Sequence, residues 1–139
     1  MMIRHSMGQD KPQETSNSDF YRSLVRTLIY VLVVFGFLLH AETAFIESPG
    51  AASMSLVLLI WSFIPYALIL LFRKFLYGSL CAAVTVFLFD FFLHLKVFSD
   101  PETSASAMKL MGMPLWNTIL ILPISYIIGA VIKKAVVKK

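Results

Sequence analysis

Four long apolar segments, separated by polar stretches, dominate the hydrophobic pattern of this chain. They cover residues 24–41, 51–72, 75–98 and 115–132. An α-helix rises about 1.5 Å per residue, so about 20 residues cross a hydrocarbon core roughly 30 Å thick. The pattern therefore predicts an all-α integral membrane protein, built as an antiparallel bundle of four transmembrane helices.

The polar stretches predict how the rest of the chain is divided. Residues 1–19 are polar and predict a disordered tail. Residues 20–134 then form the four-helix transmembrane domain, and residues 135–139 form a short basic tail. The longest connection contains the sequence Ser-Asp-Pro-Glu, which is typical of the start of a helix. It predicts a short interfacial helix near residues 101–111.

Two prolines and several small residues predict how the helices bend and touch. Pro65 lies inside the second segment and Pro123 inside the fourth, and we expect each to kink its helix. Small residues allow membrane helices to approach one another closely. The small residues expected at helix contacts are Gly36, Ser79, Ala83, Ser125 and Gly129.

Composition supports the membrane interpretation and narrows the function classes. Hydrophobic residues make up 58% of the chain and charged residues 14%, whereas a soluble domain averages about 25% charged residues. Mean hydropathy is +0.79. The single cysteine excludes an internal disulfide framework. The basic residues flank the apolar segments, so a nucleic-acid partner is not expected.

The distribution of basic residues predicts an orientation. Of the twelve lysines and arginines, only Lys96 and Lys109 fall on the side that holds the first and third connections. The other ten fall on the side of the two termini. Cytoplasmic loops carry an excess of lysine and arginine, so both termini are expected in the cytosol. A bacterial inner membrane is the expected setting.

The third apolar segment carries Asp90 and His94 near its far end, and Lys96 lies further along, where its long side chain can reach water. Helical rotation of about 100° per residue places Asp90 and His94 on one face with Ser79, Ala83 and Val86. An unpaired carboxylate inside a bilayer costs about 2.5–3.5 kcal/mol on insertion scales. We therefore expect Asp90 to be paired or solvated. His94, four residues further on, is one candidate partner.

His40, near the end of the first apolar segment, is the third candidate for an ionisable group inside the membrane, beside Asp90 and His94. It lies 14 residues beyond Arg26, and Asp90 lies 15 residues beyond Phe75, so the two reach similar depths. If the first and third helices touch, His40, Asp90 and His94 meet in one half of the bilayer.

Three kinds of chemistry fit this set of residues. It suits a hydrogen-bonded packing site, or a relay for protons or ions, because histidine titrates near neutral pH. Together with Glu42, the three residues are also weak candidates for a Zn²⁺ site. The favoured expectation is that the protein binds no metal. The sequence holds no GxSxG, HExxH or glycine-rich phosphate loop. We therefore expect neither an enzyme nor a bound cofactor.

Two functions are compatible with these features. The first is a non-catalytic interaction protein, such as an accessory subunit, an assembly factor or an immunity-type protein. Its partners would be the lipid bilayer and another membrane protein, or further copies of itself. The alternative is an oligomeric proton-coupled or ion transporter that uses Asp90, His94 and His40.

Overall fold

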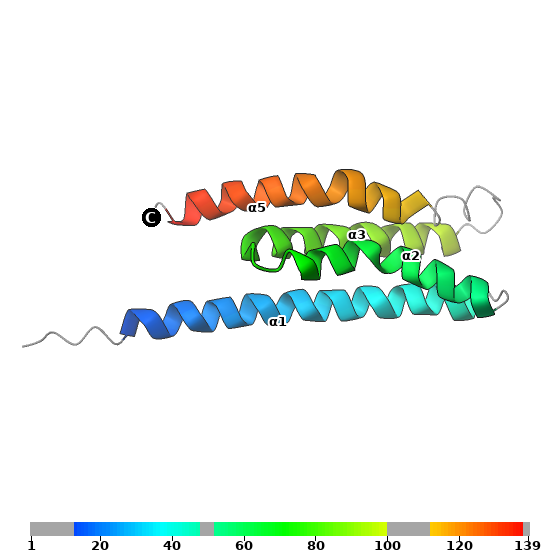
Figure 1. Cartoon of the computed structure of the whole chain (residues 1–139), viewed down its shortest axis with the longest axis horizontal. Coiled ribbons are helices and arrows are strands. Elements are labelled where there is room, and N and C mark those ends of the chain that lie inside the picture. Colours follow the sequence, from blue (N-terminus) through cyan, green and yellow to red (C-terminus); the bar gives the residue numbers. More distant parts are fainter. Residues whose placement is uncertain (1–12, 48–51, 100–111, 138–139) are drawn as a thin grey trace, which may run out of the picture.

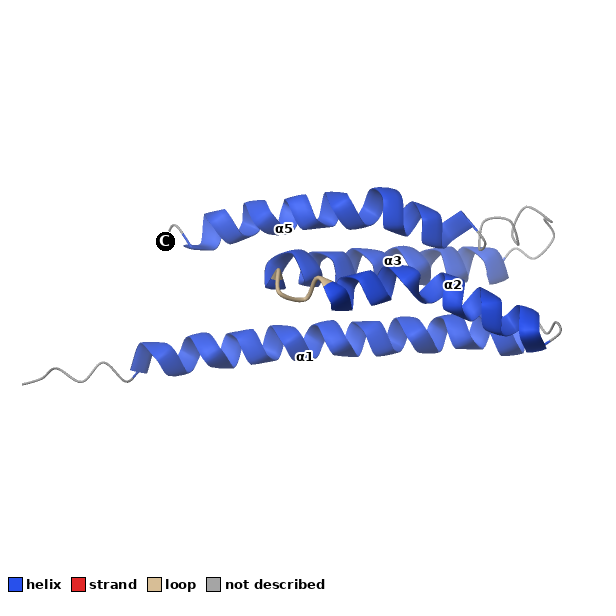
Figure 2. Ribbon diagram, in the orientation of Figure 1, coloured by secondary structure: helices blue, strands red, loops and turns tan. Residues whose placement is uncertain are grey.

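The described part of the chain is helical except for the turn at residues 72–75. The computed structural model describes residues 13–47, 52–99 and 112–137, and no strand occurs among them (Figure 2). The long helices are α1 (Gln13–Glu42), α2 (Ala52–Leu71), α3 (Leu76–Ser99) and α5 (Leu122–Val137). Four stretches of helix are long and apolar enough to cross a membrane. The prediction of four such helices is confirmed.

The bounds of α2 and α3 agree with the sequence pattern to within one residue at each end, whereas α1 begins earlier than expected. It begins at Gln13 rather than at residue 24, so residues 13–19 of the expected tail lie in a helix. Residues 13–23 contain neither glycine nor proline, and nothing in their backbone opposes the helix. The rest of that tail, and the expected interfacial helix at 101–111, lie outside the described residues.

The fourth candidate span, Gly112–Val136, changes its hydrogen-bonding pattern part way along. Residues Asn117–Ile121 form a π-helical turn that leads directly into α5. In this turn the Leu122 N–H donates to the Asn117 carbonyl, five residues back. Pro123 follows at once; it has no N–H to give, and its ring crowds the carbonyl four residues earlier. The wider π turn accommodates both effects.

The helices run side by side along one long axis (Figure 1). The end of α1, the start of α2, the end of α3 and the start of the fourth span lie together at one end, which we call the far end. The turn between α2 and α3 and the end of α5 lie at the other, the basic end. Its described basic residues are Arg22, Arg26, Arg73, Lys74, Lys133 and Lys134. The α2–α3 hairpin lies between α1 and α5.

The face of α3 that carries the small residues Ser79 and Ala83 points into the bundle. Ser79, Ala83, Val86 and Asp90 are all fully buried. Around them a core forms from apolar side chains of all the long helices. The outside of the bundle is rich in exposed apolar side chains on every helix, as expected of a surface that faces lipid.

Two glycines permit the closest helix contacts. A Cβ added to Gly129 of α5 would lie 2.5 Å from the Cα of Gly78 of α3, so the two backbones touch there. A Cβ added to Gly36 of α1 would lie 2.4 Å from Cζ of Tyr66 of α2. Both glycines were expected at helix contacts, and both lie at one. Ser125, on the same face as Gly129, is also buried.

Candidate functional site

One fully buried carboxylate joins all four helices. The Asp90 side chain is 0% exposed. Its Oδ2 accepts a hydrogen bond of 2.7 Å from the Tyr66 hydroxyl and lies 3.0 Å from Nε2 of His40. Its Oδ1 accepts a bond of 2.5 Å from Nδ2 of Asn117. We call these four residues the Asp90 cluster; each comes from a different candidate span.

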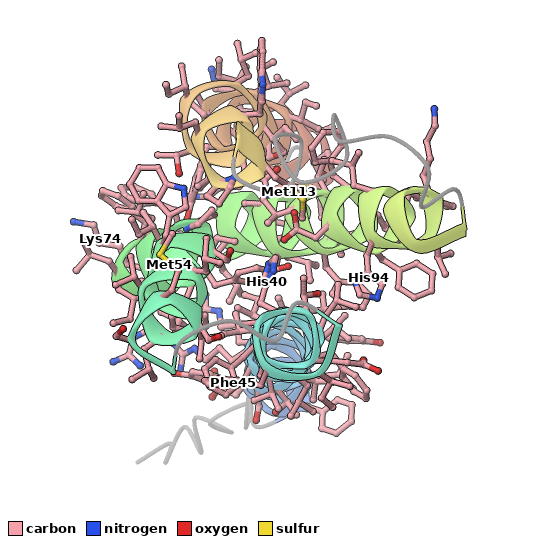
Figure 3. The ribbon with its side chains drawn as sticks, turned by 90° about the vertical axis from the view of Figure 1, so that its right-hand side faces the viewer. His40, Phe45, Met54, Lys74, His94 and Met113 are labelled. Carbon is pink, nitrogen blue, oxygen red and sulfur yellow. The ribbon has the colours of Figure 1, made fainter. Side chains whose placement is uncertain are left out.

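Tyr66 reaches Asp90 because Gly36 leaves room for its ring. Gly36 lies one turn before His40 on α1, and the Tyr66 ring occupies the space over it. The His40 and Tyr66 rings meet edge to face, with centroids 5.8 Å apart. Figure 3 shows His40 near the middle of the bundle, between the helices. A side chain at position 36 would displace the ring whose hydroxyl binds the carboxylate.

Asn117 is held against Asp90 by the π-helical turn that it begins. The side chain is 1% exposed, and its amide nitrogen is bonded to Asp90. Among the described residues, the amide oxygen of Asn117 and the hydroxyl of the adjacent Thr118 are buried without a hydrogen-bond partner. Buried polar atoms are satisfied in most proteins. The Asn117 oxygen therefore marks unused hydrogen-bonding capacity on a residue that binds the carboxylate.

His94, one turn along α3 from Asp90, is hydrogen-bonded to Thr43, the first residue of the π-helical turn Thr43–Glu47 that follows α1. Its Nδ1 lies 3.0 Å from the hydroxyl of Thr43. That hydroxyl donates to the backbone carbonyl of Leu39, so its proton is already in use. The Thr43 hydroxyl therefore contacts both the backbone of α1 and the His94 ring. His94 is half-buried, and it lies farther from the middle of the bundle than His40 does (Figure 3).

The structure thus brings together His40 and Asp90 from the predicted set, with α1 and α3 in contact as that prediction required. His94 is bonded to Thr43, directly after the end of α1. Glu42, the last residue of α1, is exposed. Among the described residues, no three histidine, cysteine, aspartate or glutamate side chains gather closely enough to hold a metal ion. The weak zinc hypothesis therefore finds no assembled ligand set there.

Tyr66, Asn117 and Thr43 are the members of this site that sequence reasoning missed. Tyr66 is fully buried and donates to Asp90. A useful signal was present: each of these residues is a polar group inside or at the end of an apolar segment, where it needs a partner.

Comparison of the chain with protein-family models, with curated proteins and with solved structures found no match. The fold and the site therefore define a class only. It is a small all-helical protein with four helices apolar enough to cross a membrane, and these helices share one buried carboxylate.

Proposed function

We propose that the chain is a non-catalytic integral membrane protein that acts by binding another membrane protein, as an accessory, assembly or immunity-type subunit. The observation that carries this proposal is the saturation of Asp90 by donors from the three other helices. In this proposal the carboxylate fixes the helices relative to one another. The bundle then presents a constant apolar exterior to its partner.

The burial of the cluster supports a structural role over a catalytic one. The Asp90 carboxylate is 0% exposed and His40 is 7% exposed. A substrate has no access to the carboxylate unless the helices separate. Interhelical hydrogen bonds of this kind stabilise the packing of membrane helices, and intramembrane ionisable groups commonly pair with one another.

The proposed arrangement in the membrane is an antiparallel four-helix bundle with both termini in the cytosol, in a bacterial inner membrane. The basic end of the bundle supports this orientation, because basic residues favour the cytosolic side. Reporter fusions after Lys139 and within residues 101–111 test it. A reporter that is active only outside the cytosol should be silent after Lys139 and active within residues 101–111, and the reverse result would overturn the orientation.

The binding function is tested by purifying the tagged protein in a mild detergent. The mass of the particle is then measured and its chains are identified. The proposal predicts a second, different membrane protein at a fixed stoichiometry. A particle that contains only copies of this chain would contradict it.

A second candidate function is proton-coupled or ion transport by an oligomer. Two observations favour it. Among the described residues, the amide oxygen of Asn117, whose nitrogen is bonded to Asp90, has no hydrogen-bond partner. The His94–Thr43 pair lies one turn further along α3. Proton flux into proteoliposomes tests this candidate with Asp90→Asn and His94→Ala. Flux above background that both variants abolish would favour transport, and flux at background for the wild type would count against it.

A further inference from the structure

The basic end of the bundle contains a cleft that the Asp90 cluster does not explain. It has a volume of about 950 Å³. The α2–α3 turn ends short of both α1 and α5, which extend past it on either side (Figure 1). The cleft is bounded by these three parts. The residues that line it are Arg22, Arg26, Lys74, Phe75, Leu76, Tyr77, Gly78, Tyr126, Gly129, Ala130, Lys133 and Lys134.

The cleft has a cationic rim. Five of its lining residues are basic: two arginines from α1, Lys74 from the turn, and two lysines from the last turns of α5. All five are exposed, and none of the described residues that line the cleft is acidic. Nζ of Lys74 lies 5.2 Å from the centre of the Phe75 ring. Positive charge from three separate parts of the chain therefore converges on one opening.

The floor of the same cleft is apolar. It is made by Leu76 and Gly78 of α3 and by Gly129 and Ala130 of α5, all within candidate membrane spans. The contact of Gly78 with Gly129 brings the two backbones together there. An apolar floor below a cationic rim, at the end of the spans, matches a molecule with an anionic head and a hydrocarbon tail.

We propose that this cleft binds one anionic phospholipid, with its phosphate among the five cations and an acyl chain along the apolar floor. Charge complementarity carries the assignment, because clustered lysines and arginines beside membrane spans recognise anionic headgroups. The apolar floor selects a lipid over a free phosphate, since a free anion gains nothing from hydrocarbon contact. The lipid would link α1 to α5 at the end where the short hairpin separates them.

Native mass spectrometry of the full chain in a nonionic detergent tests the proposal. Phosphatidylglycerol and phosphatidylcholine with identical acyl chains are titrated in parallel. One phosphatidylglycerol is expected to bind at least tenfold more tightly than phosphatidylcholine. Lys134→Gln is expected to weaken phosphatidylglycerol binding about fivefold. Lys96→Gln, which removes an exposed cation near the far end of α3, is the matched control and should leave the affinity unchanged.

A second pair of variants tests the apolar floor. Ala130→Phe fills the cleft and keeps every charge, and Ala130 is exposed enough to tolerate the larger ring. It should abolish the tight phosphatidylglycerol adduct. Ala67→Phe, at an exposed position of α2 outside the cleft, should not.

Several results would overturn the proposal. Equal affinity for phosphatidylglycerol and phosphatidylcholine would overturn it. An equal loss of phosphatidylglycerol affinity in Lys134→Gln and Lys96→Gln would also overturn it. Either result would indicate nonspecific attraction. Pyrophosphate bound as tightly as the lipid, and unaffected by Ala130→Phe, would identify a free-phosphate site. A dimer of the chain that excludes the lipid would identify a second copy as the occupant.

Discussion

Replacing the carboxylate of Asp90 separates the contribution of its hydrogen bonds from that of its charge. Asp90→Ala removes the acceptor of Tyr66, His40 and Asn117 at once. Hydrogen bonds between membrane helices contribute about 0.6 kcal/mol on average and about 1.7 kcal/mol at most. Three such bonds together contribute about 2 to 5 kcal/mol. We expect Asp90→Ala to lower the free energy of unfolding by this amount.

Asp90→Asn should cost far less, because the cluster can keep all three bonds. The new amide oxygen can take the place of Oδ2 and accept from Tyr66 and His40. Its NH₂ group can then donate to the oxygen of Asn117, which has no other partner in the described structure, once the Asn117 amide rotates by 180°. We expect a loss of less than about 1 kcal/mol, since hydrogen bonds are exchanged and not lost.

Reversible unfolding in mixed micelles of detergent and dodecyl sulfate, followed by circular dichroism, measures both effects. Asp19→Asn and Asp19→Ala, at an exposed position near the start of α1, are the matched controls and should leave the free energy unchanged. A loss for Asp90→Asn as large as that for Asp90→Ala would show that the charge itself is required. No loss for Asp90→Ala would refute the structural role of the cluster.

The two close glycine contacts give two further predictions, measured by the same unfolding assay. Gly36→Ala should destabilise the bundle by about 1–3 kcal/mol, because the added Cβ lies 2.4 Å from the fully buried Tyr66 ring. Gly129→Ala should cost a similar amount, because its Cβ meets the backbone of Gly78 at 2.5 Å. Gly112→Ala is the control: its nearest neighbour would lie at 3.9 Å, so higher helix propensity should leave it neutral or slightly stabilised. Equal effects at all three glycines would refute the contact argument.

Most of the fold could be predicted from the sequence because a single physical requirement shapes it. A helix that crosses hydrocarbon needs about 20 apolar residues, and that requirement places α2 and α3 to within one residue. The start of α1 could not be predicted in the same way. Its first turns are polar, and hydropathy does not distinguish a polar helix from a polar tail.

The candidate site was predictable in part for the same reason. Similar depth along two apolar segments pairs His40 with Asp90 provided that the first and third helices touch, which the sequence does not show. Tyr66 and Asn117 are the other two hydrogen-bond donors to Asp90. Their positions depend on how each helix is rotated and tilted, and on the π-helical turn before Pro123. Those properties arise from packing among several helices, which a linear pattern does not contain. The bond from His94 to Thr43 depends on the same packing.

The central claim is that the Asp90 cluster holds together a bundle that acts by binding a partner. Its most direct test is to purify wild type and Asp90→Asn side by side from native membranes in a mild detergent. The masses and chain compositions of the two particles are then compared. The account predicts the same second membrane protein at the same stoichiometry in both, because the substitution keeps the hydrogen bonds. A wild-type particle made of this chain alone would contradict it, as would a partner lost from a folded Asp90→Asn variant.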